Sequence, residues 1–303
     1  MYSYKAYELI IQSEFPIPEL VPHPGEVADV TIHYGEVPEV LDPGASDEVF
    51  YQVRYQVAAR QVLIKVDDCA HYLVQNGNEI IVSPRGDSSA LRVWLVGWGF
   101  SALLHQRGLL VLHAAGLYTP AGAVLLCGNS GAGKSTLLNE FLRRGYPMLV
   151  DDICGVTIAD DQPVVLPGFP RTRLWLDSAQ KLGQSVQGLE RTRPSLEKYE
   201  RQVPEQYWRQ PAPLHKIYLL SSHDQETINL EAIARVDSFG VISHNTFGKR
   251  WLKGLALQAP HFRLVAAVTQ RVPVARVTRP RASFLLTELA DALEQDLALM
   301  AGV

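Results

Sequence analysis

Gly128-Asn-Ser-Gly-Ala-Gly-Lys-Ser135 matches the phosphate-loop pattern G-x-x-x-x-G-K-[ST], the most specific signal in this chain. An apolar run over residues 123–127 predicts a strand before the loop. The pattern from Lys134 to Arg144 predicts a helix after it. A strand, a glycine-rich loop and a helix in this order are what the motif requires. The sequence therefore predicts an α/β fold with a nucleotide-binding core.

The residue types of this loop suit the binding of phosphate. Gly131 and Gly133 let successive backbone N–H groups turn inward, and the helix behind them adds positive potential. Lys134 would reach the β- and γ-phosphates, and the Ser135 hydroxyl would bind Mg²⁺. The expected nucleotide contacts are Gly128, Asn129, Ser130, Gly131, Ala132, Gly133, Lys134, Ser135 and Thr136. The alternative is a strand-to-helix turn that binds no ligand.

Two adjacent acids follow the loop. Residues 148–150 predict a short apolar strand that stops at Asp151-Asp152. A parallel strand would deliver these side chains to the edge of the sheet that holds the loop. One acid would hold Mg²⁺, and the other would accept a proton from an attacking hydroxyl. We name Ser135 and Asp152 as the metal pair, although the pattern does not distinguish the two acids. The alternative is a solvated turn.

A histidine lies one predicted strand before the loop. His113 stands in the apolar run Val111-Leu-His-Ala-Ala115. Since this strand adjoins the loop strand in sequence, His113 could orient or tune a carboxylate of the acid pair. A satisfied core histidine is the alternative.

The chain divides into two expected domains. Residues 1–86 contain short β-branched and aromatic runs separated by turn signals, which predicts a small antiparallel sheet. Asn76-Gly77 suits a two-residue hairpin turn. A helical pattern over residues 88–107, with Ser88 or Ser89 as its cap, opens the domain expected at 87–303. We therefore expect a β-rich N-terminal domain and a larger nucleotide-binding domain.

Composition excludes several classes of protein. The chain has 303 residues, 47% hydrophobic and 20% charged, with a formal net charge of −4 and a sequence pI near 6.1. It is too apolar to be disordered, and its mild acidity gives no support to nucleic-acid binding. We expect no signal peptide and no membrane span. Three widely spaced cysteines fit neither a metal site nor a disulfide framework, so a cytoplasmic location is expected.

The residues around the loop resemble the catalytic domain of HPr kinase/phosphorylase. That family has a histidine before a G-x-S-G-x-G-K-S loop, a helix ending in R-G and a strand ending in D-D. This chain has the same order in His113, residues 128–135, Arg144-Gly145 and Asp151-Asp152. The resemblance implies an HPr-kinase-like core, with His113, Lys134, Asp151 and Asp152 at the phosphoryl-transfer site and ATP or GTP with Mg²⁺ as cofactors.

Later segments depart from that family. Its second signature, an E-x-R-G-L-G-like run, is absent, and Pro167-Gly-Phe-Pro-Arg-Thr-Arg-Leu-Trp-Leu-Asp177 stands instead. This segment and residues 273–281 are similar to divergent HPr-kinase-like proteins of bacterial peptide-biosynthesis clusters. Some of those phosphorylate the C-terminal serine of a lasso-peptide precursor. The resemblance implies a peptide or protein substrate with an acceptor serine. It also implies a homo-oligomer, because related kinases assemble into rings.

Two charged regions follow the acids. Arg171 and Arg173 could clamp a phosphate or a peptide carboxylate, since guanidinium binds both in a bidentate manner. The alternative is a surface pair. Residues 191–209 are rich in arginine and glutamate, and we expect a loop that is either a solvated charged surface or a lid over the active site.

The resulting hypothesis is a Mg²⁺-dependent phosphotransferase that phosphorylates a serine of a peptide or protein, with a lasso-peptide precursor as the expected substrate. HPr(Ser) kinase/phosphorylase and a non-catalytic nucleotide-sensing or peptide-binding module are the alternatives. A transport ATPase is disfavoured, because no L-S-G-G-Q-like signature follows the loop.

Overall fold

The computed structural model describes residues 1–24, 27–42, 47–50, 53–86, 90–192 and 196–301. The chain forms two compact units. The first comprises Met1–Val111 together with Phe247–Leu264, and the second comprises Leu112–Thr246 together with Val265–Val303. Residues 91–106, which the sequence analysis assigned to the C-terminal domain, therefore pack within the first unit.

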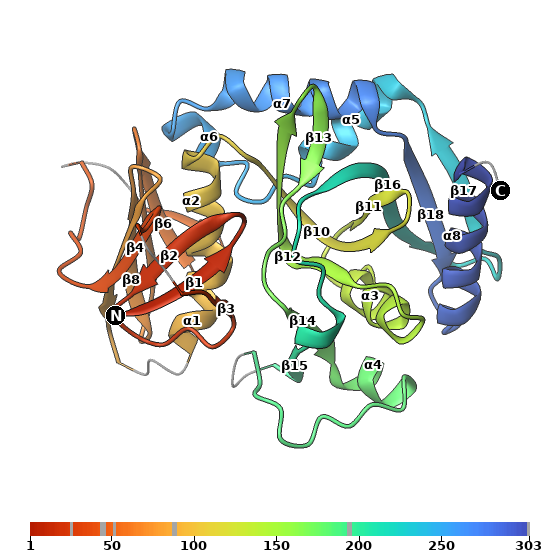
Figure 1. Cartoon of the computed structure of the whole chain (residues 1–303), viewed down its shortest axis with the longest axis horizontal. Coiled ribbons are helices and arrows are strands. Elements are labelled where there is room, and N and C mark those ends of the chain that lie inside the picture. The colour runs from red at the N-terminus through yellow and green to blue at the C-terminus, as the bar shows by residue number, and fades with distance from the viewer. Residues whose placement is uncertain (25–26, 43–46, 51–52, 87–89, 193–195, 302–303) are drawn as a thin grey trace. The chain divides into compact units, whose positions relative to one another are not determined.

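A nine-stranded sheet forms most of the first unit (Figure 1). Its order is β3-β1-β2-β4-β9-β8-β7-β6-β5, and β4 pairs parallel with both β2 and β9, so the sheet is mixed rather than antiparallel as expected. The strands are β1 (Tyr2–Ala6), β2 (Leu9–Ser13), β3 (Val21–Pro22), β4 (Val30–Tyr34), β5 (Glu48–Phe50), β6 (Val53–Ala58), β7 (Gln61–Val66), β8 (Ala70–Gln75) and β9 (Glu79–Pro84). The predicted turn joins β8 to β9, and Asn76 and Gly77 both have positive φ, 55° and 69°. The loop has three residues rather than the two expected, because Gln75 pairs with Glu79.

Short helices and an aromatic cluster complete the first unit. The predicted helix is α1 (Leu91–Trp94), a π-helical turn η2 (Leu95–Gly99) and α2 (Phe100–Gln106). Its expected caps, Ser88 and Ser89, lie outside the described residues. The ring of Trp98 lies 5.4 Å from that of Trp251 in α6 (Trp251–Gly254), and Tyr55 of β6 lies 6.1 Å from Trp251. Residues from both chain segments of this unit thus share one aromatic cluster.

The second unit contains a seven-stranded sheet in which five strands close on themselves (Figure 1). The order is β11-β10-β12-β13-β16-β18-β17, and β16 also pairs with β11, so the first five form a ring. The strands are β10 (Leu110–Thr119), β11 (Gly122–Cys127), β12 (Met148–Ala159), β13 (Gln162–Val165), β16 (Ala212–His223), β17 (Asn229–Ile233) and β18 (Val274–Pro280). The loop strand β11 pairs antiparallel with β10 and parallel with β16, so it has a neighbour on each side.

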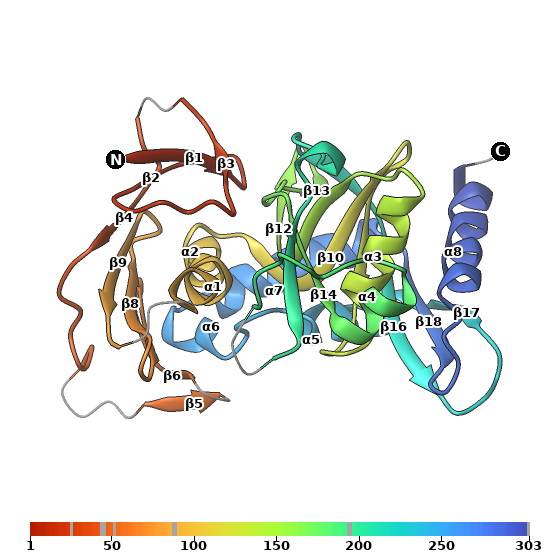
Figure 2. The same ribbon diagram turned by 90° about the horizontal axis from the view of Figure 1, so that it is seen from below.

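A separate two-stranded ribbon packs against β12 of this sheet. It pairs β14 (Arg171–Trp175) antiparallel with β15 (Lys198–Gln202), and η3 (Pro204–Gln206) follows. β14 contacts α3 (Lys134–Arg143) and α4 (Leu176–Lys181), as Figure 2 shows. The loop expected at residues 191–209 was therefore a partly wrong prediction, because part of it is a strand.

Helices α3 and α8 (Leu286–Ala301) contact each other and share the apolar core of the second unit. Leu289, Leu293 and Leu297 of α8 are each at most 9% exposed, so this stripe belongs to the core. The remaining helices are α5 (Arg235–His244) and α7 (Gln258–Arg271), and the division between the units falls within α7. No helix within the described ranges is long and apolar enough to cross a membrane.

The strand that carries the acids differs from its prediction. β12 does not stop at Asp151-Asp152 but continues to Ala159, because apolar and β-branched residues follow the acids. Asp152 has a φ of 86°, in the left-handed region that non-glycine residues rarely adopt. Such a conformation costs on the order of 1–3 kcal/mol and persists only where the surroundings enforce it. The strand is thus locally distorted at the second acid.

Candidate functional site

The phosphate-loop motif connects β11 to α3 and has the backbone that its glycines allow. Gly128, Gly131 and Gly133 have φ values of 142°, 83° and 102°. A Cβ atom on Gly128 would lie 2.7 Å from the Leu220 carbonyl oxygen, so only glycine fits there. Asn129, Ser130 and Gly131 at the tip are exposed. The loop therefore has the sharp, exposed turn that a phosphate-binding backbone requires.

The loop lysine is folded back into the turn. Lys134 is 7% exposed, and its ammonium donates to the carbonyl oxygens of Gly128 at 2.7 Å and Asn129 at 3.1 Å. Burial lowers the pKa of Lys134, and the nearby Asp152 carboxylate opposes that effect. The next hydroxyl, Thr136 Oγ1, donates to Ser178 Oγ at 3.2 Å. Lys134, which is one of the predicted nucleotide contacts, thus places a positive charge inside the loop.

The first acid bonds the loop serine directly. Ser135 Oγ donates to Asp151 Oδ1 at 2.9 Å, and Asp151 Oδ2 accepts from Thr172 Oγ1 and from the Arg173 backbone N–H, each at 3.0 Å. Asp151 is 6% exposed, so these three bonds compensate the burial of its carboxylate. The structure therefore pairs Ser135 with Asp151, whereas the sequence analysis had paired it with Asp152.

A hydroxyl and a carboxylate fit the ligand chemistry of Mg²⁺. This ion takes one or two protein oxygens and completes its shell with water and substrate phosphates. No group of three or more His, Cys, Asp or Glu side chains able to hold a metal occurs in the described part of the chain. The Ser135–Asp151 pair thus suits an ion shared with a nucleotide.

The second acid lies between a cation and the histidine. Asp152 Oδ2 accepts from Arg173 Nη1, and its Oδ1 lies 3.2 Å from His113 Nδ1. Burial by itself would raise the pKa of Asp152, but the Arg173 guanidinium and then His113 hold that pKa well below its usual range. The structure thus places His113 at the acid pair, and Asp152 is a carboxylate at neutral pH.

The arginines predicted as a clamp are buried rather than on the surface. Arg171 and Arg173 are 2% and 8% exposed. Arg171 Nη1 donates to Glu200 Oε1 at 2.9 Å, whereas Arg173 forms its ion pair with Asp152. Arg173 Nη2 is buried and has no hydrogen-bond partner among the described residues. Only Arg173 therefore lies at the acid pair with a donor to spare.

Three neighbours of the acids were missed in the sequence. Thr172 bonds Asp151, Glu200 pairs with Arg171, and Lys198 lies near Asp152, where burial lowers the Lys198 pKa and Asp152 opposes that effect. Residues 198–202 are Lys-Tyr-Glu-Arg-Gln and show no apolar alternation, so the sequence carried no periodic signal that could have found Lys198 and Glu200. Their pairing with β14 depends on tertiary structure.

Asn245, which follows α5, anchors the start of the loop. Its Oδ1 accepts from the Gly128 backbone N–H at 3.0 Å, and its backbone oxygen accepts from the His113 N–H at 2.8 Å. The residue is 6% exposed. Asn245 thus fixes the loop and the histidine strand β10 relative to each other.

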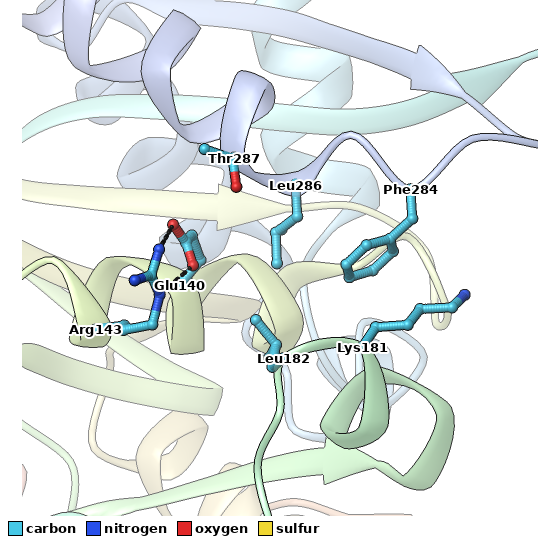
Figure 3. A pocket seen from close by; sticks show the side chains of 7 residues that line it. All are labelled: Glu140, Arg143, Lys181, Leu182, Phe284, Leu286 and Thr287. Atoms are coloured by element: carbon cyan, nitrogen blue, oxygen red, sulfur yellow. Dashed lines mark hydrogen bonds and ion pairs between the residues drawn. The ribbon is translucent and has the colours of Figure 1, made fainter.

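Figure 3 shows a separate pocket of about 320 Å³ in the second unit. Its lining side chains are Glu140, Arg143, Lys181, Leu182, Phe284, Leu286 and Thr287. Glu140 Oε2 accepts from Arg143 Nε at 3.0 Å, and the Lys181 ammonium lies 4.9 Å from the centre of the Phe284 ring. No predicted site residue lines this pocket, so the candidate site is the phosphate loop with its acids.

Comparison with known proteins adds a distant structural likeness. No protein-family model and no curated protein matches the sequence. Among solved structures, the HPr(Ser) kinase/phosphatase from Coxiella burnetii aligns with 64% of this chain and 99% of its own, at 13% identity and a TM-score of 0.33. A likeness this distant establishes neither family membership nor activity.

Proposed function

We propose that this chain transfers the terminal phosphoryl group of ATP or GTP to a serine hydroxyl of a peptide or protein. The observation that carries the proposal is the bond from Ser135 Oγ to Asp151 at 2.9 Å, with Asp152 next in the strand and 3.2 Å from His113. A nucleotide hydrolase needs only the acid beside the loop serine. The second acid, held by its own partners, suits an enzyme with a hydroxyl to deprotonate.

The loop residues have separate roles in this proposal. Backbone N–H groups of residues 128–135 and the N-terminus of α3 would hold the phosphates, and Lys134 would exchange its carbonyl partners for phosphate oxygens. Ser135 and Asp151 would hold Mg²⁺, which supplies charge neutralisation between the phosphates when bound. This assignment replaces Asp152 by Asp151 in the metal pair.

Asp152 would accept the proton of the attacking hydroxyl. Arg173 and His113 keep it ionised, since both stabilise its negative charge. A carboxylate with so low a pKa is a weak base, which is adequate for phosphoryl transfer, where the protein mainly positions the reactants and stabilises charge. His113 orients the carboxylate in this arrangement.

The acceptor class rests on the resemblance of residues 167–177 to peptide-modifying relatives. The structure is compatible with it, because part of that segment is β14, whose Thr172 and Arg173 contact the acids. We therefore propose a peptide ending in serine, of the lasso-precursor type, as the substrate. A cytoplasmic location and a homo-oligomeric assembly remain predictions.

The experiment is phosphoryl transfer followed by intact-mass measurement. The full chain is incubated with Mg²⁺ and ATP or GTP, and serine-ended precursor peptides and HPr are offered in parallel. We expect the mass of one phosphoryl group on a peptide, with the transfer lost in Asp152→Asn. The matched control is Asp161→Asn, because Asp161 is an exposed acid in the turn between β12 and β13.

Other outcomes separate the alternatives. Transfer to HPr alone would replace the peptide acceptor. Nucleotide binding by a chain that phosphorylates neither acceptor would favour a sensing module and contradict the proposed reaction.

A further inference from the structure

The two sides of the phosphate loop differ in charge. β11 is bordered by β10, which carries His113 and is followed in the sheet by β12 with Asp151 and Asp152. On its other side lie β16, which is parallel to β11, and then β18, which is parallel to β16, so the carboxyl ends of these strands meet at the edge that holds the loop. The acids thus occupy one side of the loop, and the ends of β16 and β18 occupy the other.

Arg279, near the end of β18, brings a cation to this second side. It pairs in register with Ser222 of β16. A Cβ atom on Gly133 would lie 3.8 Å from both Nε and Nη2 of Arg279, so the guanidinium lies beside the last glycine of the loop. Gly133 is the N-cap of α3, where the helix dipole is positive.

Among the residues that the structure describes, no acid pairs with this cation. Arg279 is half-buried, and its Nη1 donates to the Pro280 carbonyl oxygen at 3.1 Å. No carboxylate in the described ranges forms an ion pair with it, whereas the nearby Arg281 pairs with Asp224 at 3.2 Å. A guanidinium, a buried ammonium and a helix N-terminus thus converge at one loop. Their mutual repulsion is relieved by an anion that touches all three.

The position of the acids indicates which phosphates of the nucleotide would lie beside Arg279. In the proposed reaction the terminal phosphate must point toward Asp152, on the side of β10 and β12. The rest of the nucleotide then extends over the opposite side. We propose that Arg279 binds the non-transferred phosphates of the nucleotide and so directs the terminal phosphate toward Asp152. The proposal deepens the proposed function and rests on it.

Equilibrium binding of two nucleotides tests the proposal. Mg²⁺-ADP and a non-hydrolysable ATP analogue are titrated by calorimetry into the wild type, Arg279→Gln, Arg279→Lys and the control Arg281→Gln. Because a charge-assisted contact to phosphate is lost, we expect Arg279→Gln to weaken both nucleotides by a similar factor, about tenfold or more. The lysine variant should recover part of the affinity, and Arg281→Gln should match the wild type.

Three results would overturn the assignment. Weaker binding of the ATP analogue alone, with the affinity for Mg²⁺-ADP unchanged, would place Arg279 at the transferred phosphate. Unchanged affinity for both nucleotides would leave Arg279 without a ligand role while the proposed function stands. A wild-type chain that binds neither nucleotide would remove the proposed function itself, and the assignment with it. Thermal unfolding of each variant shows whether a loss of affinity reflects loss of the fold.

Discussion

Replacement of Asp152 by Asn separates the chemistry from the fold. Asparagine has nearly the same shape and tolerates positive φ well, so the distorted backbone at 152, with φ of 86°, is retained. What disappears is the negative charge that Arg173 and His113 stabilise. Loss of a positioned proton acceptor lowers a rate by about 10²–10⁴. This range corresponds to about 3–5 kcal/mol of transition-state stabilisation.

The same substitution has a smaller effect on folding. Removing one partner of a buried ion pair costs about 3–5 kcal/mol, because the other charge is left uncompensated. Arg173 retains a second acidic neighbour, because Glu200 Oε1 lies 3.4 Å from its Nε. We therefore expect the free energy of unfolding to fall by an amount near the lower end of that range. Since the folded pKa of Asp152 lies below its unfolded value, this contribution is present above about pH 4 and disappears as the pH falls through the folded pKa.

Three measurements on Asp152→Asn are needed. Single-turnover transfer gives the rate, nucleotide titration gives the affinity, and urea unfolding at several pH values gives the stability. We expect the rate to fall by at least a hundredfold, while nucleotide affinity is unchanged or increases, because a negative charge near the phosphates has been removed. A rate within tenfold of the wild type would refute the role of proton acceptor. Parallel loss of nucleotide binding in a folded variant would refute it as well.

The other predictions concern the loop, the core and one histidine. Asp151→Asn should raise the Mg²⁺ concentration needed for half-maximal activity, since Ser135 would be the remaining member of the proposed metal pair. An unchanged Mg²⁺ titration would contradict this. Gly128→Ala should abolish nucleotide binding in calorimetry, because its Cβ would lie 2.7 Å from a backbone oxygen. Phe141→Ala should lower the free energy of unfolding by about 3–5 kcal/mol in urea titration, since Phe141 is 1% exposed. Burial lowers the pKa of His105 to about 4, so the wild type should lose about 3 kcal/mol between pH 6.5 and 4 that His105→Gln does not lose.

Local signals in the sequence were sufficient for much of the fold. The strand, loop and helix around residues 128–135 follow from glycine spacing and apolar periodicity, and the Asn76-Gly77 turn follows from the need for positive φ. The extension of β12 past the acids was missed because two adjacent aspartates are typical of a strand end. The two aspartates are accommodated within the strand because Thr172 bonds to Asp151 and Arg173 pairs with Asp152.

The environment of the site depended on contacts between distant segments. Thr172 and Glu200 reach the acids and their arginines because β14 pairs with β15, and Asn245 reaches Gly128 over 117 residues of chain. Arg279 lies beside the loop because β18 pairs with β16 in a particular register. Periodicity predicts that such strands exist but not which strands lie next to them. These residues could therefore not be assigned to the site from the sequence alone.

The first unit is assembled from two pieces of chain, Met1–Val111 and Phe247–Leu264, and this has a consequence during synthesis. Trp251 and Phe247 emerge from the ribosome only after the entire β10–α5 segment, so the rings of Trp98 and Tyr55 remain without these partners until then. We expect the N-terminal sheet to remain partly exposed and dependent on chaperones until the later segment has been synthesised. An expression fragment that stops at residue 111 should therefore aggregate, whereas co-expression with the complementary fragment should restore solubility.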